Sequence, residues 1–202
     1  MVGETSPFHS KCPPPQIKLN AMKPWFIAVE PFSPHDGTKW QKYIEWSGLT
    51  QLAELVSLDP ILCPPVLDDV RDEYWQHIVN EDFMLAFFLD ADFLRRQVSK
   101  VQRKNLLCVF RNPSEPPISP DTSFEFTGYD LVDVQHSASA LKNCGGFPDA
   151  FSNSELSTVG LLPDFNRAVE VQKLLRQRHP EEPHAKRHLL AIFREGASAV
   201  AQ

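Results

Sequence analysis

The sequence predicts one domain of the α/β or α+β class, in which helices flank a mixed central β-sheet of about five or six strands. Short, almost continuous apolar runs of the kind that form buried strands recur along the chain, and segments with helical periodicity separate them. The length of 202 residues fits one domain. An apolar fraction of 42% is sufficient for a hydrophobic core.

The two ends of the chain differ in composition from the middle. Residues 1–21 contain Pro13, Pro14 and Pro15 and few large apolar side chains, which predicts a flexible proline-rich extension. A short ordered arm packed on the domain is the alternative interpretation. We expect the domain to span residues 22–195, with Met22 as a candidate start, and residues 196–202 to form a disordered tail.

The strand predictions follow from apolar runs and from alternation. Runs covered on both faces are predicted at Trp25–Val29 and at residues 84–89, 106–110 and 189–193, with helix an alternative for 84–89. Residues 52–58 are a weaker candidate for either a strand or a helix. Phe124 and Phe126 alternate with Glu125 and Thr127, which indicates a half-exposed strand, and Gly128 is typical of a bulge.

Three segments are predicted to be helical. Thr38 can cap a short helix that runs to Trp46 and ends at Gly48. Residues 92–103 place their apolar side chains near one face and their basic ones toward solvent. The clearest helix begins at Asp164, carries an apolar stripe and basic residues in its last turns, and ends before His179.

Composition excludes several classes of partner and location. The formal net charge of -6 and the pI of about 5.6 make nucleic acid an unsuitable partner, because an acidic surface repels phosphates. No apolar run reaches the length of a membrane span and the N-terminus lacks a secretory signal, so we expect no membrane association. The four dispersed cysteines are typical of a reduced, cytoplasmic protein: Cys12, Cys63, Cys108 and Cys144.

Residues 124–151 begin as a strand and then lose regular periodicity, which predicts an irregular segment displayed outward. Cys144 stands before two glycines whose N–H groups could stabilise an oxyanion. His136 could act as its base, and Asp149 or Asp133 could orient that histidine. This reading makes the protein a small hydrolase or transferase with its nucleophile in the loop 143–146. The alternative is a structural cysteine before a glycine turn.

Metal and cofactor sites are not expected. His184 and His188 are four residues apart, but Lys186 and Arg187 lie between them and the zinc-protease motif is missing. His188 also adjoins a predicted strand, in which residues four apart are separated by about 13 Å. The glycine-rich nucleotide-binding motifs are missing as well.

An acidic cluster lies beside two aromatic residues. It can be a solvated helix start, or a contact surface in which carboxylates surround exposed Tyr74 and Trp75 and attract a basic partner. Trp40 and Trp46 likewise either serve as interface anchors or cover the sheet. We therefore predict a non-catalytic cytosolic protein, of an immunity or regulatory type, that binds another protein. The predicted binding residues are Asp68, Asp69, Asp72, Glu73, Tyr74, Trp75, Asn143 and Phe147.

Overall fold

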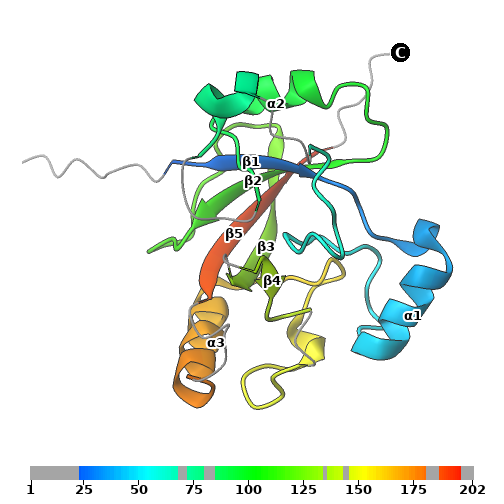
Figure 1. Ribbon diagram of the computed structural model, residues 1–202. Helices are drawn as coiled ribbons and strands as arrows, with labels where there is room; N and C mark the ends of the chain where they lie inside the picture. The colour runs from blue at the N-terminus through cyan, green and yellow to red at the C-terminus, as the bar shows by residue number, and fades with distance from the viewer. Residues whose placement is uncertain are drawn as a thin grey trace, which may run out of the picture.

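The computed structural model describes residues 23–67, 72–79, 85–133, 136–142, 146–180 and 187–196 (Figure 1). The predicted extension, residues 1–21, and all of the predicted tail except Gly196 lie outside these ranges. The described strands are β1 (Trp25–Val29), β2 (Asn105–Arg111), β3 (Phe124–Asp133), β4 (Ala138–Ser139) and β5 (His188–Glu195). The α-helices are α1 (Thr38–Ser47), α2 (Ala91–Gln97) and α3 (Phe165–Arg178), with 3-10 turns η1 (Pro34–Asp36), η2 (Asp72–His77) and η3 (Asn153–Glu155).

The five strands form one curled sheet in the order β1-β2-β5-β3-β4 (Figure 1). Helices accompany this sheet, so the α+β class and the strand number are confirmed. Every strand pair is antiparallel, so the expectation of a mixed sheet is wrong. The reason is that no helix of the described chain serves as a crossover between parallel neighbours; even β1 and β2, separated by α1 and α2, pair antiparallel.

The continuous apolar runs became strands because both of their faces are covered. All five residues of β1 are buried, as are the middle residues of β2 and β5. Helix α2 packs against β1, and α3 packs against β3 and β5. Phe88, in the run predicted at 84–89, forms only isolated bridges with Phe26 and Ile78, so the described part of that run is not a sheet strand.

Side-chain caps fix where two helices begin. Asp90 accepts hydrogen bonds from the N–H groups of Asp92 and Phe93 at the start of α2, and Asp164 accepts one from Arg167 in α3. Helix α2 is shorter than the predicted 92–103, because Val98 leaves helical geometry and packs into the core.

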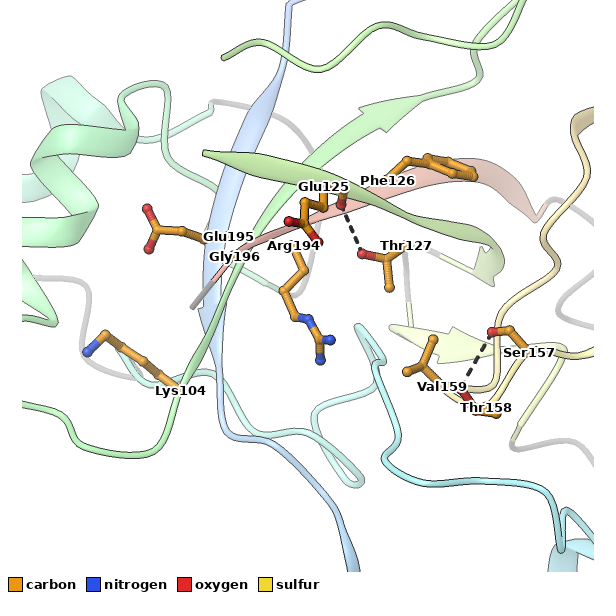
Figure 2. Close-up of a pocket in the computed structure, with 10 residues that line it drawn as sticks. All are labelled: Lys104, Glu125, Phe126, Thr127, Ser157, Thr158, Val159, Arg194, Glu195 and Gly196. Carbon is orange, nitrogen blue, oxygen red and sulfur yellow. Dashed lines mark hydrogen bonds between the residues drawn. The ribbon is translucent and has the colours of Figure 1, made fainter. Parts of the chain in front are cut away.

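Gly128 divides β3 into two parts. The register with β5 shifts between Phe126 and Gly128, which confirms the predicted bulge. A Cβ atom on Gly128, whose φ is +147°, would lie 2.6 Å from the Cβ of Leu161. Leu162 then forms two backbone hydrogen bonds with Tyr129, of 2.8 and 3.0 Å. Before the bulge, β3 and residues 157–159 border a cavity of about 530 Å³ (Figure 2).

A buried ion pair joins β3 to the segment that follows β4. Lys142 Nζ lies 2.6 Å from Asp130 Oδ2, and both side chains are 0% exposed. Lys142 also donates to the carbonyl of Val56 at 2.8 Å. The other carboxylate oxygen of Asp130 accepts from Ser139 Oγ and from the N–H of Leu131. Each buried charge is therefore compensated, as burial requires.

We expect Lys142→Met to lower the free energy of unfolding by about 3–5 kcal/mol, because it leaves Asp130 as an uncompensated buried charge. The double variant Lys142→Met/Asp130→Asn should recover part of this loss, since an amide oxygen can still accept from Ser139 and Leu131. Urea denaturation measures both, with Lys39→Met on the exposed face of α1 as the control. Equal losses for Lys142→Met and Lys39→Met would show that the ion pair does not stabilise the fold.

Candidate interaction surface

Turn η2 is anchored by Tyr74, which is only 4% exposed. Its ring meets those of Phe88 and Phe93 edge-on at 6.1 and 5.7 Å, and its hydroxyl donates to Gln97 Oε1 at 3.3 Å. The prediction that Tyr74 is exposed is wrong, because the ring completes the apolar core beneath α2. Tyr74 therefore anchors η2 from below, and its ring is not exposed at the surface.

Trp75, the next residue, is 66% exposed, as predicted. Glu73, which precedes Tyr74, is exposed too, so both sequence neighbours of the buried tyrosine face solvent. The backbone of Leu89 donates to the carbonyl of His77 at 2.8 Å, which joins η2 to the residues that precede α2. We call Glu73, Trp75, Leu89, Asp90 and Asp92 the Trp75 surface; all five are exposed.

The Trp75 surface carries negative charge next to apolar groups. The backbone N–H of Phe93, with that of Asp92, holds the pKa of Asp90 below its usual value, so this carboxylate is ionised at neutral pH. Asp68 and Asp69 lie outside the described residues. Asp72 begins η2, and the structure does not describe its side chain.

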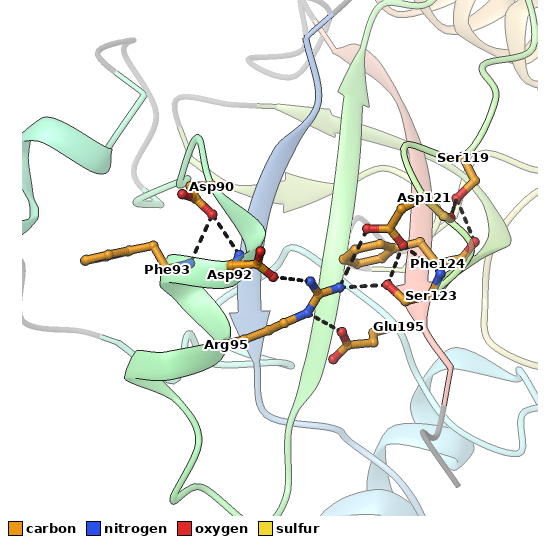
Figure 3. A network of polar contacts seen from close by, with 9 residues as sticks. All are labelled: Asp90, Asp92, Phe93, Arg95, Ser119, Asp121, Ser123, Phe124 and Glu195. Atoms are coloured by element: carbon orange, nitrogen blue, oxygen red, sulfur yellow. Dashed lines mark hydrogen bonds and ion pairs between the residues drawn. The ribbon is translucent and has the colours of Figure 1, made fainter.

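Arg95 fixes the helix that carries part of this surface (Figure 3). Its guanidinium donates to Glu195 and Asp92, both at 2.6 Å, and to Ser123 at 2.7 Å. It also lies over the ring of Phe124, with 5.4 Å from Cζ to the centroid. Three segments thus meet at one side chain, and α2 is held against the ends of β3 and β5.

The other predicted aromatic contacts fall into two groups. Trp40 is buried against Phe32, with ring centroids 5.3 Å apart, so it covers the core. Phe147, which was predicted as a binding residue, is buried between His179 and Arg187, and these neighbours enclose its ring. Trp46 is 58% exposed on α1, away from α2 in Figure 1.

Of the residues proposed for catalysis, the structure describes His136, Asp133 and Asp149. His136 Nδ1 lies 2.7 Å from Asp133 Oδ2, so Asp133 is the carboxylate that orients this ring. Asp149 lies 3.0 Å from His179 instead, so its predicted role beside His136 is wrong. Cys144 and Asn143 lie outside the described residues.

Much of the segment 124–151 is buried, contrary to the expectation that it is displayed outward. Residues 129–133 and 139–142 are buried, as are Ala150 and Phe151. The reason is that β3 lies between β5 and β4 in the sheet. The ion pair between Lys142 and Asp130 holds the segment that follows β4 against β3.

His188 begins β5 and contacts Arg111 and Asn112, whose amide nitrogen lies 2.7 Å from its Nδ1. Burial, with the nearby charges of Arg111 and Arg176, lowers the pKa of His188. His184 lies outside the described residues. Within the described ranges, no three His, Cys, Asp or Glu side chains form a group that could hold a metal ion.

Cys63 and Cys108 are free thiols in the core. Burial raises the pKa of each to about 12, so neither forms a thiolate at neutral pH. Cys63 also donates weakly to the carbonyl of Leu55 at 3.4 Å. Both behave as small apolar residues.

We expect iodoacetamide at pH 7.5 to leave Cys63 and Cys108 unmodified in the native protein and to label both in denaturant. Peptide mass spectrometry measures labelling at each cysteine. The same experiment tests the catalytic hypothesis, because a thiolate nucleophile at Cys144 should react fastest of all. Native labelling of Cys63 at the rate of a free thiol would contradict its burial.

The His188 contacts predict a pH dependence. A folded-state pKa below the ordinary value of 6.5 means that the unfolded chain takes up the proton first as the pH falls. The contribution of His188 to stability is therefore complete above about pH 6.5 and decreases below it. We expect His188→Gln to reduce the loss in free energy of unfolding between pH 7.5 and 5.5, whereas exposed His35→Gln should not. An unchanged pH dependence in His188→Gln would refute this assignment.

None of the helices in the described chain is long and apolar enough to cross a membrane. Comparison of the chain with family models, with curated proteins and with solved structures finds no match in any of the three.

Proposed function

We propose that this protein is a non-catalytic cytoplasmic binding protein that engages a basic protein partner through the Trp75 surface, in an immunity-type or regulatory role. The observation that carries the proposal is the 66% exposed indole of Trp75, which directly follows a tyrosine, Tyr74, that is fixed in the core. Tryptophan is among the residues that contribute most to binding energy at protein interfaces.

The anchoring of η2 supports binding because it reduces the entropy lost on association. The three ring and hydroxyl contacts of Tyr74 hold the turn, and His77 stacks on Phe93 with centroids 3.8 Å apart. A side chain presented from a fixed backbone loses fewer degrees of freedom than one on an unrestrained loop. Trp75 is thus placed where a partner can cover it at low cost.

Charge supports a basic partner. Glu73 is exposed two residues before Trp75, Asp90 is exposed directly after Leu89, and the whole chain has a formal net charge of -6. Negative charge at the rim speeds association with a basic surface and repels acidic competitors. The affinity should therefore fall as ionic strength rises.

We expect Trp75→Ala to weaken binding by about tenfold or more, because it removes the apolar anchor. The full-length protein is used to capture its partner from source-cell lysate, and calorimetry then measures Kd for each variant. Trp46→Ala is the matched control, since it removes a similarly exposed indole from α1. An unchanged Kd for Trp75→Ala, or equal effects of both variants, would refute the proposed surface.

A further inference from the structure

Described segments cover the outer edge of β1 and the second half of β3, whereas a stretch in the first half of β3 is left open. The outer edge of β1 is covered, because Phe26 exchanges two backbone hydrogen bonds with Phe88 and Ala28 accepts one from Val66. On the other side of the sheet, β4 and Leu162 cover β3 from Tyr129 onward. At residues 125–127, no described segment pairs with the edge of β3 that faces away from β5.

This open edge forms one wall of the cavity of about 530 Å³ in Figure 2. The opposite wall is the segment 157–159, which is fixed because Ala53 donates to Thr158 at 2.8 Å and Val56 donates to Val159 at 3.1 Å. The space ends at Gly128, where the two walls come together because Leu161 lies close to the backbone of that glycine. We call the space between them the β3 groove.

We propose that the β3 groove receives an extended segment of a partner protein that carries a lysine or arginine and adds as a strand to β3 at residues 125–127. Main-chain hydrogen bonds to an open sheet edge give such binding its affinity, and side chains beside the edge give it specificity. The inference rests on the proposed function in one respect only: the occupant is a protein.

The charge on the open edge itself, that of Glu125, favours a basic residue in that segment, whereas Lys104 lies at the far side of the groove and donates to the carbonyl of Val101. Arg194 is held by Glu54 at 2.7 Å, and Glu195 is held by Arg95 at 2.6 Å. Glu125 is exposed and forms no ion pair with another described residue. A cationic side chain opposite Glu125 on an added strand would lie within the range of cross-strand contact, about 5 Å between Cβ atoms.

The remaining lining suits a peptide main chain. Thr127, Ser157 and Thr158 contribute hydroxyl groups, and Figure 2 shows Lys104 at the far side of the groove from these residues. Phe126 is 45% exposed on the same strand and offers an apolar contact to an alternate side chain. Sites for small apolar ligands are lined mainly by apolar groups, whereas this groove is lined mainly by polar ones.

The test uses the full-length protein and a displayed library of random seven-residue peptides as the probe. We expect the enriched peptides to carry lysine or arginine. Fluorescence polarisation of a synthetic enriched peptide should show that Glu125→Lys weakens its affinity by about fivefold or more. Glu115→Lys, which reverses an exposed charge on another loop, should leave the affinity within twofold.

N-methylation of the peptide tests strand addition itself. Methyl groups on alternate amides should abolish binding, whereas those on the intervening amides should be tolerated, because only alternate N–H groups face the edge. Failure to enrich any peptide, or loss of binding without this alternation, overturns the groove. Circular dichroism confirms that each protein variant is folded.

The same peptide measured against Trp75→Ala separates this inference from the proposed function. Loss of binding in Glu125→Lys but not in Trp75→Ala supports the groove, even where the Trp75 surface fails its own test. Loss in Trp75→Ala but not in Glu125→Lys overturns the groove and leaves the Trp75 surface in place.

Discussion

The ion pair between Lys142 and Asp130 is the constraint on which the β3 side of the structure depends. Both groups are fully removed from water, so each must have its partners in place before burial is tolerable. Lys142 donates to Asp130 in the sheet and to the carbonyl of Val56 in a separate segment. Asp130 also accepts a hydrogen bond from Ser139. One arrangement of these segments satisfies all the contacts, which gives β4 its register and closes the sheet on that side.

This constraint acts on only one half of β3. From Tyr129 onward the strand is covered by Leu162 and β4, and it contains Asp130. At Gly128 the bulge and the close approach of Leu161 end that coverage. The earlier half therefore keeps β5 on one edge and the β3 groove on the other. The boundary between the half that the ion pair fixes and the half that is accessible lies at Gly128.

Sequence reasoning succeeded where structure is decided locally. Continuous apolar runs predicted β1, β2 and β5, and Asp164 predicted the start of α3, because burial and capping involve neighbouring residues. It failed for Tyr74, whose polar surroundings in sequence hide its packing on distant Phe88. The ion pair was missed as well, although an aspartate at position 130 inside an apolar strand was a signal that a buried cation must be close.

An open sheet edge is a hazard, since it can pair with another copy of the same chain. The first half of β3 limits this hazard with a bulge and with the charge of Glu125. Antiparallel pairing of two such short edges brings the two copies of Glu125 close together, and like charges on paired strands are destabilising. A segment with a basic residue meets no such repulsion. The charge of Glu125 therefore both discourages self-association and selects the partner in the proposed complex. This is why we assign specificity to Glu125 and affinity to the main-chain hydrogen bonds of the strand beside it.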